Sequence, residues 1–267
     1  MSEHLRLDAA DGVATVTIDR PAKRNAMSHA MWTAIPALLA EVAADDSVRA
    51  LVLRGGEHFS AGADIGEFAT LRADAAGARR YGEAVLAASA AIAGLAKPTV
   101  AAITGYCIGG GCELALACDL RVAATDSAFG ITPAKLGIVF PMPSTRQLVQ
   151  LVGPAWAKQI LYTADIIDAA TALRIGLVNE LHEPAELLGR ARSLATTIAS
   201  RSRVSVLGAK TVIARITQTA AGARAGHPAD DSAEESLREL YDSSVASADY
   251  AEGVAAFLAK RPPRFTD

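Results

Sequence analysis

Two short segments rich in glycine and alanine are the places in this 267-residue sequence where chemistry is most readily imagined. Residues 55–68 read GGEHFSAGADIGEF, and residues 104–119 read TGYCIGGGCELALACD. Each follows an apolar stretch of strand length and precedes a predicted helix, and small side chains let a ligand approach the backbone N–H groups. Because a helix N-terminus also favours negative charge, the two loops together could direct two N–H donors at one oxyanion. Glu113, one turn into the second helix, would then be a base beside them.

Each loop also has a purely structural interpretation. Both could be ordinary strand-to-helix turns, with Asp64 and Glu67 forming a variant of the capping box at the first helix. Glu113 could be a solvated first-turn residue instead of a base. The second loop matches neither the dinucleotide fingerprint G-x-G-x-x-G nor a P-loop, because no Lys follows its glycines. The combination of two loops with one carboxylate is what favours a site.

The hydrophobic pattern indicates the elements that hold these loops. Segments of strand length, apolar or alternating and ended by turn residues, are 13–19, 49–53, 98–103, 119–123 and a shorter one at 177–181. Helices are expected at 28–44, with Ser28 as N-cap, near 75–95 and at 112–118.

The pattern is mostly helical from about residue 144 onward. The expected helices are 144–152, 153–163, 168–175, 184–200, 203–218, 232–245 and 248–260, and residues 220–231 are expected to be a helix–helix connection. Strands followed by helices predict an α/β core with a helical C-terminal part.

Composition excludes several classes of protein. The net charge is −3 and no run of Lys or Arg occurs, which argues against nucleic-acid binding. No stretch approaches the roughly 18 unbroken apolar residues of a membrane span, so we expect no membrane association. Cys107, Cys112 and Cys118 match no zinc or redox spacing and are expected to be buried. The start of the chain carries no targeting segment, so a cytoplasmic protein is expected.

Five ordered motifs resemble those of the enoyl-CoA hydratase/isomerase (crotonase) family. They are TIDRPAKRNAMS, FSAGADI, GYCIGGGCELALACDLRVAA, ADIIDAATALRIGLVNEL and ADYAEGVAAFLAKRPPRF, which together span essentially the whole chain. The resemblance implies an α/β spiral of ββα units over residues 1–200 and a helical region over 201–267 that mediates trimers, often paired as hexamers. It also implies an acyl-CoA thioester as substrate, with no metal and no further cofactor.

The resemblance assigns roles to residues of both loops. It implies that the N–H groups of Ala63 and Gly110 form an oxyanion hole and that Glu113 is the first of two catalytic glutamates. Substrate contacts are expected from both loops and from the segment that follows them, at Ala61, Ala63, Asp64, Ile65, Gly109, Thr132, Pro133 and Phe140. The segment 75–95 is expected to wall the acyl pocket.

The resemblance fails at the second catalytic glutamate. Family hydratases carry it in a segment written roughly F-x-x-P-E-x-x-L-G, and FGITPAKLGIVFP at 129–141 places Pro133 there. Proline can neither accept nor donate a proton. The wording T-P-A-x-L-G resembles the methylmalonyl-CoA decarboxylase branch, although that branch has His and Tyr where this chain has Ala63 and Phe140.

The reaction therefore stays open between three thioester-enolate chemistries: hydration first, isomerisation second and decarboxylation third. An acyl-CoA-binding protein with little catalysis and an RNA-binding relative are the remaining alternatives. Other candidate residues have structural interpretations: His58 on the surface, Tyr106 packed between strand and helix, Lys135 solvated, and Asp119 capping or pairing. Phe257 and Lys260 could contact coenzyme A from a neighbouring subunit, pack, or be solvated.

Overall fold

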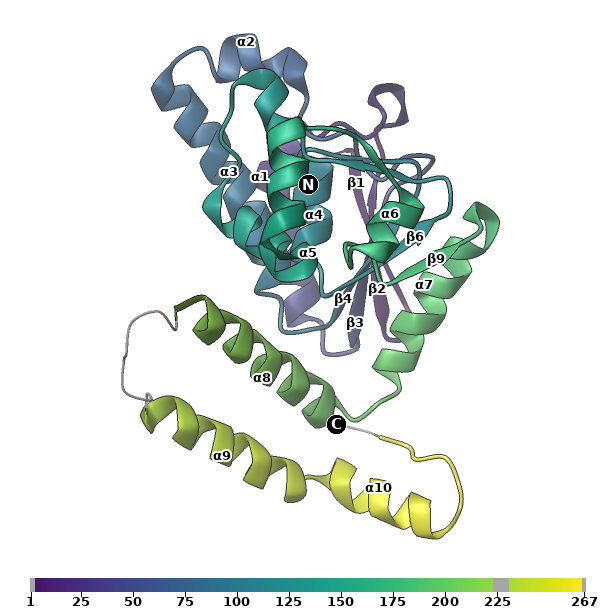
Figure 1. Ribbon diagram of the computed structural model, residues 1–267. Helices are drawn as coiled ribbons and strands as arrows, with labels where there is room; N and C mark the ends of the chain where they lie inside the picture. Colours follow the sequence, from purple (N-terminus) through teal and green to yellow (C-terminus); the bar gives the residue numbers. More distant parts are fainter. Residues whose placement is uncertain (1–2, 223–230, 266–267) are drawn as a thin grey trace. The chain divides into compact units, whose positions relative to one another are not determined.

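A computed structural model describes residues 3–222 and 231–265 (Figure 1). Internal contacts divide the chain into two compact units, Met1–Ala195 and Thr196–Asp267. The first unit holds the strands and both glycine-rich loops. The second consists of helices.

A six-stranded sheet organises the first unit. Its strands, in spatial order, are β1 (Leu5–Ala10), β2 (Val13–Ile18), β3 (Ala50–Arg54), β4 (Thr99–Ile103), β6 (Leu120–Ala124) and β9 (Glu180–His182). Strands β1 and β2 are antiparallel, and all the other neighbours are parallel. The strands expected at 13–19, 49–53, 98–103 and 119–123 are confirmed, whereas the one at 177–181 is displaced to Glu180–His182.

Strand β1 was not expected from the pattern. Asp11 and Gly12 connect it to β2, and both have positive φ, 52° and 76°. An Asp-Gly pair with positive φ is the preferred two-residue turn of an antiparallel hairpin. The dipeptide is therefore the signal that would have revealed the strand.

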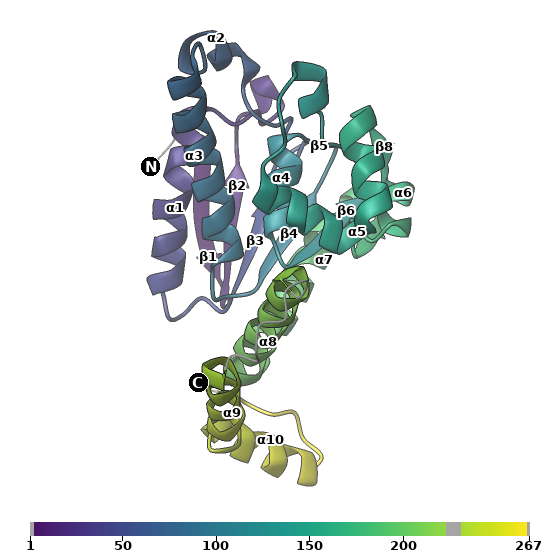
Figure 2. The ribbon, with the colours of Figure 1, turned by 60° about the vertical axis from the view of Figure 1, so that its left-hand side comes forward.

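Helices α1 (His29–Ala44) and α3 (Ala75–Ala93) lie side by side against the sheet (Figure 2). Ser28 caps α1, as expected, by accepting a hydrogen bond of 3.3 Å from the Met31 N–H. Helix α1 buries Met31, Trp32, Ile35, Leu38, Leu39 and Val42, the spacing that puts one helical face toward a core. In the sequence, the chain passes from α1 to α3 through β3, the 3-10 turn η2 (Ile65–Glu67) and the short α2 (Phe68–Leu71).

A second, three-stranded sheet carries the second loop. Strand β5 (Tyr106–Ile108) pairs in parallel with β7 (Ala128–Gly130), which pairs antiparallel with β8 (Ile167–Asp168). Helix α4 (Gly110–Ala117) follows β5, and η3 (Pro133–Leu136) follows β7. Helix α5 (Met142–Thr163) is interrupted at Gly153, whose φ of 72° breaks it where two separate helices were expected.

The remaining helices follow the predicted pattern closely. They are α6 (Ala169–Arg174), α7 (Pro184–Ala199), α8 (Arg203–Gly222), α9 (Asp231–Val245) and α10 (Ala248–Leu258). Of the connection expected at 220–231, residues 220–222 and 231 are helical and the rest lies outside the described residues. On α10, Phe257 is 83% exposed, which excludes its packing into the core of the single chain.

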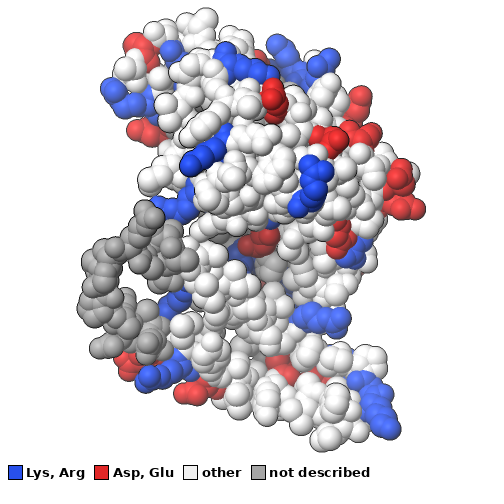
Figure 3. Space-filling view, in the orientation of Figure 1, with Lys and Arg blue, Asp and Glu red and all other residues white. Residues whose placement is uncertain are grey.

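Within the described ranges, no helix is long and apolar enough to cross a membrane. On the face shown in Figure 3, basic and acidic side chains are interspersed and do not gather by sign. Cys107, Cys112 and Cys118 are all buried, as expected.

Candidate active site

Main-chain hydrogen bonds join the first loop to the start of the second. The Phe59 N–H donates to Thr104 O at 2.8 Å, and the Ser60 N–H donates to Tyr106 O at 2.9 Å. In return the Ile108 N–H donates to Ser60 O at 3.0 Å. The first loop thus pairs with β5 in parallel, and the two glycine-rich segments become neighbours.

Polar side chains fix the far end of the first loop. The Arg20 guanidinium donates to Asp64 Oδ2 at 2.7 Å, and the Gly66 N–H donates to Asp64 Oδ1 at 3.1 Å. Hydrogen bonding to Arg20 holds the pKa of Asp64 below its usual value. The expected capping box is wrong in one respect: Glu67 accepts a hydrogen bond from the His29 N–H, at 2.7 Å, and so caps α1 instead.

Backbone conformation requires the first of the three consecutive glycines in the second loop, and close packing requires the other two. Gly109 has φ 54° and ψ −116°, a conformation that side chains rarely allow. A Cβ on Gly110 would lie 2.8 Å from Trp32 Cζ2, and one on Gly111 would lie 2.5 Å from Ser60 O. The loop therefore turns tightly into α4 while it packs against the first loop and α1.

Two N–H groups remain available where the loops meet. The neighbouring N–H groups of Ala61, Gly62 and Asp64 all donate within the protein, and that of Gly109 donates to Gly130 O at 2.7 Å. Among the described residues, the N–H groups of Ala63 and Gly110 have no acceptor. They are close together, because a Cβ built on Gly110 would lie 3.5 Å from Ala63 N. Such a pair can bind a single anionic oxygen.

Glu113 lies on α4, one turn after Gly110, and is only 4% exposed, which excludes the solvated alternative. Its Oε1 accepts a hydrogen bond of 2.6 Å from Ser144 Oγ, and Ser144, on α5, is 1% exposed. Burial raises the pKa of Glu113, while the hydrogen bond from Ser144 opposes that rise. A carboxyl with a raised pKa can exchange protons nearer neutral pH than a solvated one.

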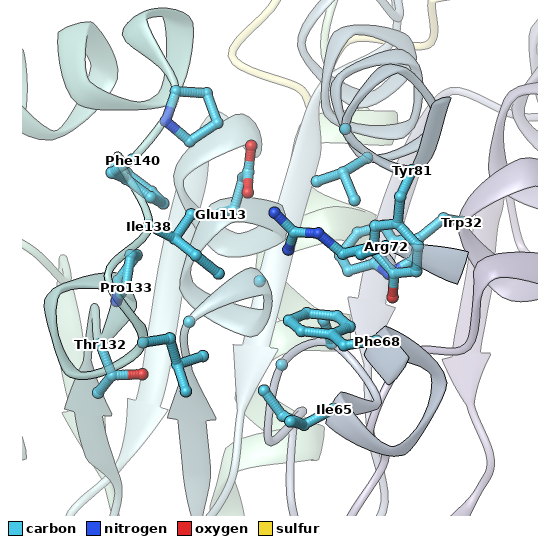
Figure 4. Close-up of a pocket in the computed structure, with 18 of the residues that line it drawn as sticks. Trp32, Ile65, Phe68, Arg72, Tyr81, Glu113, Thr132, Pro133, Ile138 and Phe140 are labelled. Atoms are coloured by element: carbon cyan, nitrogen blue, oxygen red, sulfur yellow. The ribbon is translucent and has the colours of Figure 1, made fainter. Parts of the chain in front are cut away.

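Figure 4 shows the cavity into which these groups open, which has a volume of about 240 Å³. Its described lining includes every predicted site residue except Asp64: Ala61, Ala63, Ile65, Gly109, Gly110, Glu113, Thr132, Pro133 and Phe140. The segment 75–95 was expected to wall the pocket, and α3 does so with Tyr81, Gly82, Val85 and Leu86. Asp64 instead directs its carboxylate to Arg20.

Comparison with known proteins decides the family. The enoyl-CoA hydratase/isomerase family model matches residues 8–267. The chain belongs to the enoyl-CoA hydratase/isomerase family.

Individual relatives agree with this membership. The chain is 36% identical to a crotonyl-CoA hydratase from Syntrophomonas wolfei over 266 residues, which cover 98% of both chains. It is 34% identical to a short-chain-enoyl-CoA hydratase from Clostridium acetobutylicum, over 96% of this chain and 94% of the relative. A solved enoyl-CoA hydratase/isomerase family structure from Hyphomonas neptunium matches with 42% identity and a TM-score of 0.91, covering 98% of this chain and 97% of the other.

Membership of the enoyl-CoA hydratase/isomerase family makes the chain an enzyme and confirms the expected crotonase-like α/β fold with C-terminal helices.

Several cavity residues were not anticipated from the sequence. Trp32, Phe68, Arg72, Leu136, Ile138, Val139 and Pro141 line the cavity, and Ser144 binds its carboxylate. Arg72 lies at the end of α2 and Trp32 in α1, and nothing in their spacing marks them as site residues.

Other candidate residues lie away from the cavity lining. Tyr106 is 38% exposed and stacks on the His58 ring at 4.6 Å between centroids, so its expected packing between strand and helix is wrong. Asp119 accepts hydrogen bonds from the Thr99 N–H and hydroxyl, which confirms a structural role. Lys135 is exposed on η3.

Proposed function

We propose that this enzyme acts on an acyl-CoA thioester and that its reaction is of the enoyl-CoA hydratase type. One observation carries the proposal: the unpaired N–H groups of Ala63 and Gly110 meet beside the buried Glu113 in one cavity. Among the described residues that line this cavity, Glu113 is the one carboxylate. The names of the crotonyl-CoA and short-chain-enoyl-CoA hydratases that it resembles support the same chemistry.

The chemistry of hydration fits these three groups. Ionised Glu113 takes a proton from water as the water oxygen bonds to C3 of the enoyl thioester. The electrons of the C2=C3 bond then move onto the thioester oxygen, where the two N–H groups stabilise the negative charge. The enolate collapses when protonated Glu113 returns the proton to C2. Backbone donors suit this role because they are fixed in place and do not titrate.

Pro133 separates this chain from a two-glutamate hydratase. It lines the cavity where the second carboxylate of the family motif would be, and it cannot transfer a proton. General acid–base help is typically worth about 10²–10⁴ in rate, so hydration with Glu113 serving both steps is expected to be slower than with two carboxylates. Isomerisation is the second candidate, because one base can move a proton between two carbons of the same enolate. Pro133 argues against the kind of family isomerase that keeps only the second carboxylate, so Glu113 would have to be that base.

The decisive experiment combines product analysis with one substitution. Enoyl-, hydroxyacyl- and malonyl-type CoA esters are incubated with enzyme, and the products are weighed by mass spectrometry. Hydration adds the mass of one water, decarboxylation removes CO₂, and isomerisation moves the double bond at constant mass. Glu113→Gln should lower turnover about 10²–10⁴-fold while CoA-ester binding persists. A wild-type protein that binds these esters but converts none would instead be an acyl-CoA-binding protein.

Three further properties belong to the same proposal. The acyl-CoA is the substrate, and no metal or redox cofactor is needed for enolate chemistry. Residues 201–267 are proposed to mediate a homotrimer or hexamer, which light scattering would measure. Three cysteines buried within one short segment fit a reducing compartment such as the cytoplasm. The net charge of −3 and the sequence without a run of Lys or Arg argue against a nucleic-acid partner, and salt-resistant RNA binding would contradict that.

A further inference from the structure

Arg72 places a positive charge in an otherwise apolar part of the cavity. It follows α2, is half-buried, and belongs to the cavity lining. Figure 4 shows its side chain pointing into the cavity beside Phe68 and Tyr81. Its Cζ lies 4.4 Å from the centroid of the Phe68 ring and 5.6 Å from that of Tyr81. The two rings hold the stem and the planar head in place.

No carboxylate neutralises this guanidinium within the described part of the chain. The ion pairs of the described residues do not include Arg72. Glu67, five residues before Arg72, accepts a hydrogen bond from the His29 N–H instead. Glu113 accepts its hydrogen bond from Ser144, and no ion pair joins it to Arg72 among the described residues. A guanidinium held partly out of water without an acceptor is unfavourable, and an anionic ligand would remove that cost.

Tyr81 supplies a second donor at the same wall. It lines the cavity and is buried, and no described residue accepts a hydrogen bond from its hydroxyl, because the indole N–H of the neighbouring Trp32 can only donate. Burial raises the pKa of Tyr81 to about 12, so the hydroxyl keeps its proton and can donate at any physiological pH. A guanidinium and a phenol together can satisfy the oxygens of one carboxylate.

We infer that the preferred substrate is an acyl-CoA whose acyl chain carries a second, anionic group, such as a terminal carboxylate, bound by Arg72 and Tyr81. The inference rests on the proposed function, because it assumes that the thioester oxygen binds at Ala63 and Gly110. Apolar side chains of the cavity, among them Val85, Leu86 and Ile138, would contact the methylene groups between the two ends. Arginine suits this task, because its fork of donors matches the geometry of a carboxylate.

The test compares matched pairs of saturated CoA thioesters, which bind without reacting. Dissociation constants are measured by calorimetry for glutaryl- against pentanoyl-CoA, adipyl- against hexanoyl-CoA, and suberyl- against octanoyl-CoA. In the wild type, at least one acidic member should bind about tenfold or more tightly than its partner of equal length. Arg72→Gln should abolish this preference, and Tyr81→Phe should reduce it. Arg80→Gln removes an exposed charge on the next helix, α3, outside the cavity lining, and should leave the preference intact.

Free coenzyme A separates the two possible uses of the guanidinium. The affinity for free coenzyme A should be equal in the wild type and in Arg72→Gln. If Arg72→Gln weakens the binding of free coenzyme A as much as that of the acidic thioester, Arg72 contacts the phosphates of the coenzyme, which overturns the inference. If the wild type binds no acidic thioester more tightly than its neutral partner of equal length, the inference is overturned by the wild type alone. If crotonyl-CoA is still converted in that case, the proposed function stands alone. If no CoA ester binds at all, the proposed function fails as well.

Discussion

The two glycine-rich loops supply equivalent N–H groups, yet they are held by different forces. Hydrogen bonds and an ion pair fix the first loop, through Ser60, Asp64 and Arg20. Close packing fixes the second, where the missing side chains of Gly110 and Gly111 let Trp32 and Ser60 approach. A loop of the first kind is weakened by removing a polar group, and a loop of the second kind by adding a methyl group.

The carboxyl groups that follow the loops differ in the same way. Asp64 meets Arg20, whose hydrogen bond lowers the pKa of Asp64 and keeps it ionised. Glu113 meets a neutral hydroxyl in a buried site, and burial raises its pKa. Two acidic residues in similar loop-to-helix contexts therefore differ in ionisation because of their surroundings, not because of their positions in the motif. Asp64 holds the backbone of the first loop, and the proposed function assigns the proton transfer to Glu113.

Gly110→Ala should have the largest effect. The new Cβ would lie 2.8 Å from Trp32 Cζ2, so the loop or the ring must move and the N–H of residue 110 is displaced. Loss of one such donor typically lowers kcat by about 10²–10³. Steady-state turnover of the best CoA ester measures this. Gly189→Ala in α7 is the matched control, since nothing lies within 4 Å of its Cβ position and its turnover should not change. A fully active Gly110→Ala enzyme would contradict the packing account.

Asp64→Asn should act mainly on stability. It leaves Arg20 partly buried without a negative partner, which is expected to lower the free energy of unfolding by about 1–3 kcal/mol at neutral pH. Because the pKa of Asp64 is lower in the folded state, this contribution is complete above the unfolded pKa of about 3.9. It is lost as the pH falls through the folded pKa. Urea denaturation at neutral and acidic pH tests this, and a difference that grows toward acid would refute it.

Ser144→Ala should give the smallest but most diagnostic change. The hydrogen bond from Ser144 lowers the pKa of Glu113, so its loss should raise that pKa further. If ionised Glu113 is the base, the acidic limb of the kcat/KM profile then moves to higher pH. The stability loss should be about 0.5–1.5 kcal/mol.

Ser127→Ala provides the matched control for this prediction. Ser127 is buried and donates to Ile103 O at 3.0 Å, so a similar hydrogen bond is lost away from Glu113. Its pH profile should coincide with that of the wild type. Equal profiles for Ser144→Ala and the wild type would mean that Ser144 is structural only.

Much of the fold could be predicted because its elements are long enough to show a period. The strands at 13–18 and 99–103 and the helices from α5 onward follow directly from apolar spacing and turn residues. Strands β5, β7 and β8 have only two or three residues, too few for any alternation to appear. Their pairing depends on tertiary contacts that a local pattern does not encode.

The candidate site was predictable only where a local motif carried it. The loops containing Ala63 and Gly110 are unusual in composition, and Glu113 is an isolated charge in an apolar helix. Ser144 and Arg72 lie in segments of ordinary composition. Helix α5 brings Ser144 to the carboxylate of Glu113, and the end of α2 brings Arg72 to the cavity. Asp64 is the opposite case, because the motif that contains it suggested a contact with substrate. In the structure its carboxylate instead accepts a hydrogen bond from Arg20, 44 residues earlier in the sequence.

The most direct test of the central claim is the vibrational frequency of the thioester carbonyl in the bound state. Crotonyl-CoA labelled with ¹³C at the carbonyl is bound to Glu113→Gln, which should not convert it, and the C=O stretch is recorded by difference infrared spectroscopy. Two donors on one oxygen should shift the band below its position in water, and Ala63→Pro, which removes one N–H, should reverse most of that shift. A bound ester whose carbonyl frequency equals that in water, or is unchanged by Ala63→Pro, would contradict the claim.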